Sequence, residues 1–296
     1  MLNIDYIPFK NRFLTYVYMK RTPFLFLLFS SLFLSLLLSA FCNTLKKGTI
    51  DPSGTTVQTR FNPPPGFVRK KADTNSFATY LRNIPLKPVG TKVKYYDGSV
   101  KTEDVYDAVV NMDLENKDLQ QCADAIMRLR AEYFYAHKQY DKISFNFTSG
   151  FKADYSEWMK GNRVLVNGNN VTWKKSAEPA NTYQVFRSYM DVVMEYAGTL
   201  SLSKSLKHKE LKDITVGDVF IHGGSPGHAE IVMDIAENTK GEKVFLLAQS
   251  YMPAQDTQIL KNPNDAALSP WYSVNESSHI TTPQWTFTSN ELMCWE

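Results

Sequence analysis

The sequence predicts an α+β protein, and two observations support this fold class. Residues 118–137 repeat apolar side chains at steps of three and four, which is typical of a helix with one buried face. From Gly217 onward the pattern changes to short apolar runs separated by turn residues, which is typical of antiparallel strands. Helices followed by strands, without regular alternation between them, indicate the α+β class.

The other elements follow in chain order. A short helix is expected over residues 76–84, where Pro85 would end it, and a second long helix over residues 181–197, where Gly198 would end it. Asp118 can cap the helix over residues 118–137. Strands are expected over residues 92–96, 104–112, 143–148, 163–166, 171–174, 218–222, 229–235, 244–250 and 257–260, with NGNN as a hairpin turn between the fourth and fifth.

Residues 1–42 have the composition of a membrane-targeting leader. Lys20 and Arg21 precede PFLFLLFSSLFLSLLLSAFC, which is uncharged and about as long as a membrane span. We expect this segment to direct export to the periplasm or the cell surface, and to be the only membrane contact. Three outcomes stay open: a lipoprotein with Cys42 as its lipidated first residue, cleavage near Ala40, or an uncleaved anchor.

The charge of the chain belongs to this leader. Four basic residues against one acidic residue give residues 1–42 a net charge of +3, which equals that of the whole chain. The remainder is therefore neutral, and we expect no nucleic-acid partner. Residues 43–60 are small, polar and aperiodic, so they predict a flexible tether. Residues 61–296 then form a single α+β domain, of unknown oligomeric state.

Residues 216–234 read VGDVFIHGGSPGHAEIVMD, in which a Gly-Asp turn, a strand and a Gly-rich loop precede a His that opens the next strand. Here the chain resembles the NlpC-type and amidase branches of the papain-like cysteine hydrolases. The resemblance implies a Cys-bearing helix packed on an antiparallel sheet, with residues 142–215 inserted as a hairpin and a helix. It also implies that Cys122 is the nucleophile, His228 its base and Gln249 the group that orients the imidazole.

The chemistry of such a site is consistent with these residue types. A thiol with an ordinary pKa of about 8.5 needs an imidazole and the positive end of a helix to react as a thiolate. Gln120 or Gln121, beside Cys122, can donate an amide N–H to a developing oxyanion. The implied reaction is hydrolysis of an amide or acyl bond in a cell-wall or peptide substrate, without a cofactor or a metal.

Other interpretations of the same residues remain open. Cys122 lies on the apolar stripe of its own helix, so it can be an inert core thiol, or the disulfide partner of Cys294. Asp124, Arg128 and Glu132 have the spacing of an i,i+4 charge ladder. A metal site has its candidate ligands among His222, His228, Glu230 and Asp218. A non-catalytic envelope protein that binds a glycan or a protein is the alternative function, with candidate aromatic residues Trp158, Trp271, Tyr272 and Trp285.

Over its length the chain resembles an uncharacterised family of bacterial exported proteins, the domain of unknown function four-eight-four-six. The resemblance covers roughly residues 61–290. It rests on the segments FNPPPGF, YLRNIPLKP, YYDG, DLQQCADAIMRLRAEY, FNFTSGF, YAGTLSLSK, GDVFIHGGSPGHAEIVMD, LLAQSYMPAQ and ILKNPND. This family implies no activity, so the functional hypothesis rests on Cys122 and His228.

Overall fold

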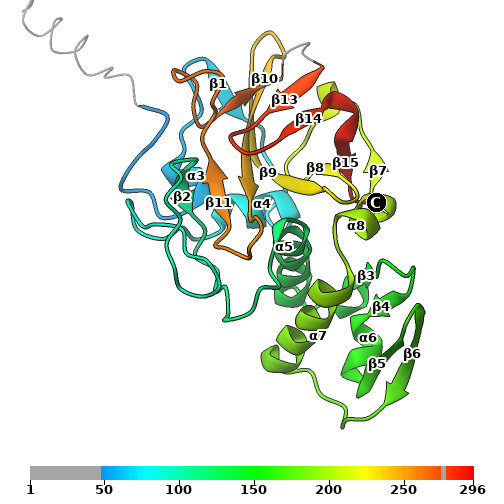
Figure 1. Cartoon of the computed structure of the whole chain (residues 1–296). Helices are drawn as coiled ribbons and strands as arrows, with labels where there is room; N and C mark the ends of the chain where they lie inside the picture. The colour runs from blue at the N-terminus through cyan, green and yellow to red at the C-terminus, as the bar shows by residue number, and fades with distance from the viewer. Residues whose placement is uncertain (1–47, 275–277) are drawn as a thin grey trace, which may run out of the picture. The chain divides into compact units, whose positions relative to one another are not determined.

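A nine-stranded antiparallel sheet organises the computed structural model, which describes residues 48–274 and 278–296 (Figure 1). This part of the chain also contains six α-helices, so the predicted α+β class is confirmed. The predicted leader, residues 1–42, and residues 43–47 of the predicted tether lie outside the described residues.

The main path of the sheet runs β2-β11-β10-β9-β8-β15-β7, with β1 paired to β9 and β12 paired to β10. Its strands are β1 (Phe67–Arg69), β2 (Tyr106–Val109), β7 (Lys207–His208), β8 (Val219–His222), β9 (His228–Asn238), β10 (Lys243–Gln249), β11 (Gln258–Leu260), β12 (Tyr272–Ser273) and β15 (Leu292–Cys294). The central strands β8 to β11 overlap four predicted strands.

Strand β9 is central because its sequence suits burial on both faces. Its first nine residues are buried, and they are mainly apolar or small. Ala229, Ile231 and Met233 join the core that also contains α5, whereas Val232 joins a second core with Phe287 on the other face. A strand covered on both sides is expected to be mainly apolar, and the buried Asp234 is paired with Arg69 and Arg82. The sheet therefore separates two hydrophobic cores.

The helices are α3 (Val57–Arg60), α4 (Phe77–Asn83), α5 (Cys122–Ala136), α6 (Tyr155–Met159), α7 (Tyr183–Tyr196) and α8 (Thr199–Ser205). Helix α5 packs against β9 and β10, and α7 packs against α5. Most of α5 is buried, including the predicted stripe residues Ile126, Leu129 and Tyr133. A helix covered on nearly all sides is a core element rather than a surface helix.

Residues 143–196 add a smaller layer on the side of α5 away from the main sheet (Figure 1). It consists of α6, α7 and two hairpins, β3 (Ser144–Asn146) with β4 (Lys152–Asp154) and β5 (Asn162–Asn167) with β6 (Asn170–Lys175). The NGNN hairpin is confirmed, since Asn167 pairs with Asn170 and Gly168 takes a positive φ. Aromatic rings join this layer to α5, with Phe186 stacked on Tyr135 at 4.5 Å between ring centroids.

Four predictions about elements differ from the structure. The folded unit begins at Gly48 rather than at residue 61, because α3 buries Val57 and Arg60. Residues 92–96 form no strand, since only Lys94 and Tyr95 make isolated bridges. Gly198 does not simply end a helix, because it is the N-cap of α8.

The fourth difference is the tail, where no strand was expected after residues 257–260. It contains the strands β12, β13 (His279–Thr281), β14 (Thr286–Thr288) and β15. Strand β15 pairs with β8, and Phe287 in β14 is fully buried. These strands are too short to show a period-2 pattern, so only long-range pairing defines them.

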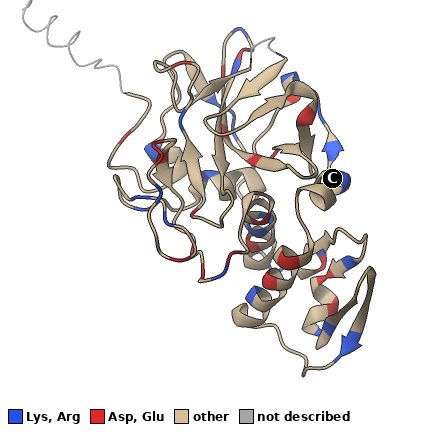
Figure 2. Ribbon diagram, viewed as in Figure 1, with Lys and Arg blue, Asp and Glu red and all other residues tan. Residues whose placement is uncertain are grey.

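Lys and Arg residues alternate with Asp and Glu residues along much of the described chain (Figure 2). The charge pattern along the chain therefore does not by itself identify a site.

Candidate functional site

Cys122 is the first residue of helix α5, where Gln121 occupies the N-cap position. The predicted cap was Asp118, and the structure corrects this. Asp118 accepts hydrogen bonds from the Ala254 backbone N–H at 2.6 Å and from the Gln121 side chain at 3.1 Å, so it anchors the preceding segment to another loop. The first N–H groups of a helix have no carbonyl partner within the helix. The sulfur therefore sits where backbone donors are available.

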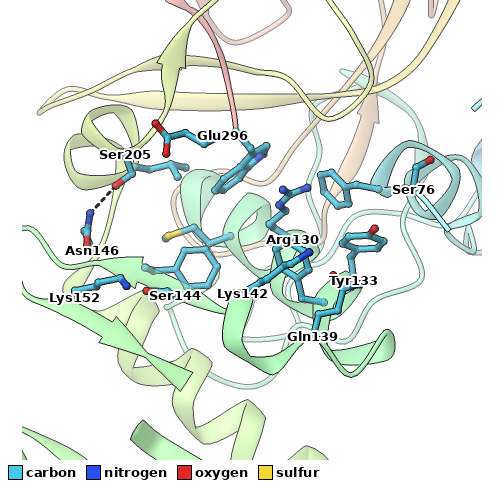
Figure 3. Close-up of a pocket in the computed structure, with 16 residues that line it drawn as sticks. Ser76, Arg130, Tyr133, Gln139, Lys142, Ser144, Asn146, Lys152, Ser205 and Glu296 are labelled. Atoms are coloured by element: carbon cyan, nitrogen blue, oxygen red, sulfur yellow. Dashed lines mark hydrogen bonds between the residues drawn. The ribbon is translucent and has the colours of Figure 1, made fainter. Parts of the chain in front are cut away.

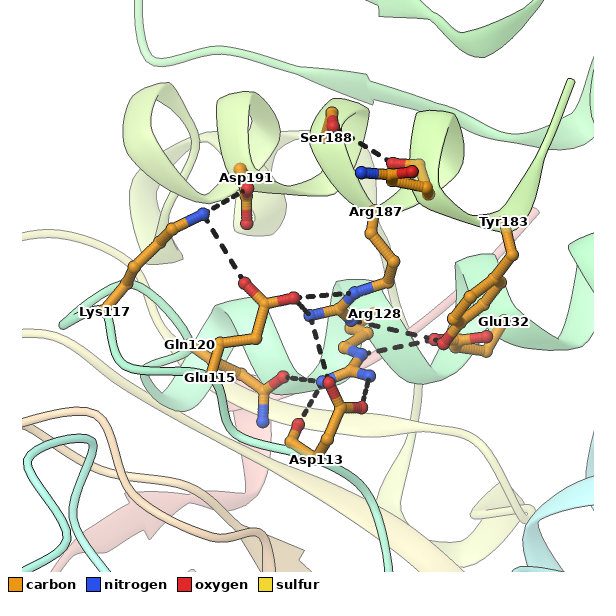
Figure 4. Close-up of polar contacts among 11 residues, drawn as sticks. Asp113, Glu115, Lys117, Gln120, Arg128, Glu132, Tyr183, Arg187, Ser188 and Asp191 are labelled. Atoms are coloured by element: carbon orange, nitrogen blue, oxygen red, sulfur yellow. Dashed lines mark hydrogen bonds and ion pairs between the residues drawn. The ribbon is translucent and has the colours of Figure 1, made fainter. Parts of the chain in front are cut away.

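A network of ion pairs fixes the segment that leads into Cys122 (Figure 4). The Arg128 guanidinium donates to both the carboxylate and the carbonyl of Asp113 and to Gln120 Oε1. Arg187 on α7 binds Glu115 at 2.6 Å. Because these arginines are nearly buried, their pairing holds the loop on both α5 and α7.

The predicted charge ladder along α5 is only half present. Arg128 does pair with Glu132, at 3.3 Å. Asp124 instead accepts a hydrogen bond from the Gln121 backbone N–H at 3.0 Å, as an acidic residue at the third helical position does. Burial raises the pKa of Asp124 to about 8. At neutral pH this carboxyl group is therefore mostly neutral.

His228 is the first residue of β9, and the loop before it packs tightly. A side chain at Gly227 would meet Thr199 Oγ1 and the Gly224 carbonyl oxygen, both at 2.4 Å from its Cβ. The His228 ring is 1% exposed and lies 4.8 Å from the Tyr251 ring and 5.3 Å from that of Trp285, between centroids. Glycine thus lets the loop approach α8, while the rings fix the imidazole.

Gln249, at the end of β10, binds the imidazole. Its Oε1 lies 2.7 Å from His228 Nε2, and its Nε2 donates to Gln284 Oε1 at 2.7 Å. Lys101, which is buried, donates to the same Gln284 oxygen at 2.8 Å. Gln255 Oε1 accepts a further hydrogen bond from Lys101 at 2.9 Å.

This chain of hydrogen bonds determines the tautomer of His228. A lysine ammonium only donates, so the Gln284 atom that it contacts is the oxygen. Gln249 must then donate to that oxygen through its amide nitrogen, which leaves its own oxygen for the imidazole. His228 therefore donates through Nε2 to Gln249, and Nδ1 is the ring nitrogen that Gln249 leaves free.

Glu230 is a site residue that the prediction considered only as a metal ligand. Its Oε1 lies 3.4 Å from His228 Nε2 and accepts a hydrogen bond from Thr282 at 2.7 Å. The side chain is fully buried, and its Oε2 has no hydrogen-bond partner. The available signal was the alternation of the strand, which places residues 228 and 230 on one face.

The electrostatics favour a charged imidazole. Burial lowers the pKa of His228, but hydrogen bonds with Cys122 and Glu230 and the nearby charge outweigh it and raise the pKa from 6.5 to about 9. The His228 imidazole is therefore protonated at neutral pH.

Cys122, His228 and Gln121 line one cavity of about 500 Å³, which we call the thiol cavity. Its other lining residues are Asp118, Leu119, Ala123, Asp124, Met194, Glu195, Ala197, Gly198, Thr199, Gly224, Ser225, Pro226, Gly227, Tyr251, Met252 and Trp285. Gln249 stands behind His228 rather than in the lining. Apart from His228, the ionisable lining groups are Cys122, three acids and the phenol of Tyr251, with no lysine or arginine.

The structure also bears on the two alternatives of a Cys122–Cys294 disulfide and a metal site. Cys122 and Cys294 are both free thiols, so the disulfide is not formed. Within residues 48–274 and 278–296, no group of three or more His, Cys, Asp or Glu side chains could hold a metal ion. His222 instead pairs with Glu291, and Asp218 with Lys209.

The four aromatic residues considered for glycan binding lie in different parts of the structure. Trp158, Trp271 and Tyr272 are buried in the two cores. Trp285 lines the thiol cavity. No aromatic groove is formed by these four residues together.

Comparison with known families matches residues 57–294 to Domain of unknown function (4846). The match covers most of the chain, which therefore belongs to this family. The search found no matching curated protein and no matching solved structure. In the part of the chain that the structure describes, no helix combines the length and apolar character needed to cross a membrane.

Proposed function

We propose that this protein is an exported thiol hydrolase that cleaves an amide or acyl bond with Cys122 as nucleophile and His228 as acid and base. The supporting observation is the position of the imidazole. Gln249 holds its Nε2, and Cys122 lines the same cavity. A hydrogen bond between Cys122 and the ring contributes to the raised pKa of His228. A cysteine, a histidine and an orienting amide in this chain order are what a papain-like arrangement requires.

The reaction follows from these groups. The Cys122 thiolate attacks the carbonyl carbon, a C–S bond forms, and the carbonyl electrons move to the oxygen. The backbone N–H of Cys122 and the Gln121 amide stabilise that oxyanion. The imidazolium gives its proton to the leaving group as the C–N or C–O bond breaks.

Hydrolysis of the thioester completes the cycle. His228 takes a proton from water, which attacks the acyl carbon, and the C–S bond breaks to release the acid and regenerate the thiolate. Gln249 keeps Nε2 protonated in both halves of the reaction, so that Nδ1 alone exchanges protons.

The lining of the thiol cavity suggests a substrate class. It supplies Asp118 and Glu195, beside the mostly neutral Asp124, and no basic side chain except His228. A substrate that is neutral or positively charged near the scissile bond fits this lining better than an anion does. Peptide amides, including those of cell-wall peptides, meet this condition.

The proposed location is the cell envelope, with Cys42 as a lipid attachment point. This part of the proposal rests on the basic and apolar pattern of residues 1–42. Fractionation of cells that express the full chain, with a Cys42→Ser variant beside it, tests it. Recovery in the cytoplasm would contradict export, and unchanged membrane attachment of the variant would contradict lipidation at Cys42.

The function is tested with 4-nitrophenyl acetate, an activated acyl ester that needs no knowledge of the substrate. We expect the wild type to release 4-nitrophenol in a burst and to gain one acetyl group on Cys122, as seen by mass spectrometry. Cys294→Ala is the matched control and should behave like the wild type. Equal acylation of Cys122→Ala and the wild type would reject the nucleophile, and would favour a protein that only binds its ligand.

A further inference from the structure

A second cavity, of about 740 Å³, lies beside the later turns of α5 (Figure 3). We call it the Arg130 cavity. It is lined by Ser76, Phe77, Met127, Arg130, Tyr133, Phe134, Gln139, Lys142, Ser144, Phe145, Asn146, Lys152, Leu202, Ser205, Trp295 and Glu296. None of these residues lines the thiol cavity.

Arg130 has aromatic neighbours but no acidic partner. Its guanidinium carbon lies 4.6 Å from the ring centroid of Phe134, 4.8 Å from that of Phe77 and 5.2 Å from that of Trp295. Among the arginines that the structure describes, it alone has neither a hydrogen bond nor an ion pair. Burial lowers its pKa to about 10, so the group is still charged at neutral pH. This partly buried guanidinium, which has no hydrogen-bond acceptor in the described chain, is available to a ligand that supplies one.

Two more donors in the same cavity lack acceptors. The indole Nε1 of Trp295 is buried and makes no hydrogen bond. Lys142 is exposed; its ammonium group lies 5.9 Å from the Phe134 ring centroid and, within the described chain, contacts no carboxylate. Lys152 differs, because it pairs with Asp154 at 3.1 Å.

The one acidic residue in the lining already has a partner. Glu296 pairs with Lys207 at 2.5 Å, and Lys207 is not part of the cavity lining. The cavity therefore presents two unpaired cations and an N–H group beside aromatic rings.

We infer that the Arg130 cavity binds a phosphate monoester of an aromatic or otherwise apolar compound. A phosphate monoester carries about −1.5 to −2 charge at neutral pH, which matches the two unpaired cations better than a monocarboxylate does. A guanidinium and an ammonium both bind phosphate oxygens, and the indole N–H supplies a third donor. Phe77, Phe134 and Trp295 offer apolar surface for the organic part of the ligand. This inference does not depend on the proposed hydrolase activity.

Calorimetry on the full chain with phenyl phosphate tests the inference, with benzoate and benzyl alcohol as the monoanionic and neutral counterparts. We expect phenyl phosphate to bind at least about 10-fold more tightly than benzoate, and benzyl alcohol not to bind detectably. Absence of phenyl phosphate binding by the wild type would overturn the inference. Benzoate binding as tight as phenyl phosphate would overturn the assignment to phosphate.

Three variants locate the ligand. Arg130→Gln should weaken binding by at least about 10-fold, and Lys142→Gln by a smaller factor. Trp295→Phe keeps the ring and removes only the N–H, so a several-fold loss would show that the indole donates to the phosphate. Lys240→Gln, on an exposed turn, is the matched control and should bind like the wild type. Unchanged binding by both Arg130→Gln and Lys142→Gln would reject the site, and circular dichroism separates loss of binding from loss of fold.

The phosphate can belong to a soluble ester or to a lipid headgroup. Phosphatidylcholine vesicles with and without phosphatidate distinguish these sources. Phosphatidate-dependent binding that Arg130→Gln abolishes assigns the cavity to a lipid phosphate. Binding of phenyl phosphate without that dependence assigns it to soluble esters, and both results support the phosphate site.

Discussion

The thiol cavity and the Arg130 cavity both lie against helix α5, but their polar groups are arranged in opposite ways. In the thiol cavity His228 belongs to a chain of hydrogen bonds through Gln249 and Gln284 to Lys101. In the Arg130 cavity the guanidinium and the Trp295 N–H have no acceptor. A group whose neighbours already satisfy it keeps one orientation, as acid–base chemistry requires. Donors without acceptors are instead available to a ligand.

The two cavities also differ in charge, although one helix contributes to both. The thiol cavity takes Asp118, Glu195 and the mostly neutral Asp124 into its lining, whereas the Arg130 cavity takes Arg130, Lys142 and Lys152, and its one acid, Glu296, is paired with Lys207. The overall charge of the described chain could not have revealed this, since both signs are interspersed along it (Figure 2). The difference suggests two unlike ligands, a neutral or cationic substrate and an anion.

The largest expected effect comes from His228→Ala, which tests whether the cavities act independently. Acylation of Cys122 by 4-nitrophenyl acetate should slow by about 10²- to 10⁴-fold, since the group that exchanges the proton is removed. Binding of phenyl phosphate in the Arg130 cavity should not change. A rate close to that of the wild type would remove His228 from the mechanism, and a parallel loss of phenyl phosphate binding would show that the cavities are coupled.

A smaller effect is expected from Gln249→Leu, which breaks the hydrogen-bond chain but leaves the imidazole. We expect acylation to slow by about 10- to 100-fold, the order of loss seen when the partner that orients a metal-binding histidine is removed. At a pH above the His228 pKa of about 9, where the imidazole is neutral, the ¹⁵N chemical shifts of His228 should show a mixture of tautomers instead of a single form protonated at Nε2. Gln249→Glu retains an acceptor and should recover much of the rate. An unchanged tautomer in Gln249→Leu would contradict the orienting role.

Asp124→Asn tests how much of the acidic lining is charged. Because the folded pKa of Asp124 is raised to about 8, stability is greatest below its unfolded pKa near 3.8 and is lost as the pH rises through about 8. The amide can still accept the Gln121 N–H, and it does not ionise. We therefore expect the variant to be more stable at pH 7 by about 1–3 kcal/mol, with a flatter pH dependence in urea unfolding. Parallel curves for the two proteins would disprove the buried neutral carboxyl.

Glu230→Gln should have the smallest effect. It should shift the pKa of His228 and, with it, the pH profile of Cys122 acylation. Glu230 helps to raise the pKa of His228 to about 9, so the variant should titrate about 1 pH unit lower. The alkaline limb of the acylation profile should move with it, and proton NMR of the imidazole measures the titration directly. In the wild type, the stability due to this raised pKa is present below about pH 6.5 and is lost as the pH rises through 9. Coincident titration curves would exclude Glu230 as a cause.

The sequence by itself determined the fold class and the main secondary structure. The helix around residues 122–136, the hairpin at Gly168 and the strands β8 to β11 all follow from local periodicity and turn chemistry. The choice of Cys122, His228 and Gln121 also came from the sequence, and these three side chains line one cavity. Local patterns sufficed for α5, β9 and β10 because these elements are long enough to show their apolar pattern, and for the hairpin because its turn residues are distinctive.

Only the tertiary structure decided the environment of these groups. The acceptors around His228 come from Glu230 and Gln249, and the chain continues through Gln284 in the tail to Lys101, far away in sequence. The Arg130 cavity likewise combines α5 with Phe77, which precedes the helix in the sequence, and Trp295, which lies far after it. Side-chain burial and hydrogen-bond partners depend on contacts between distant segments, and one sequence contains no local signal for such contacts.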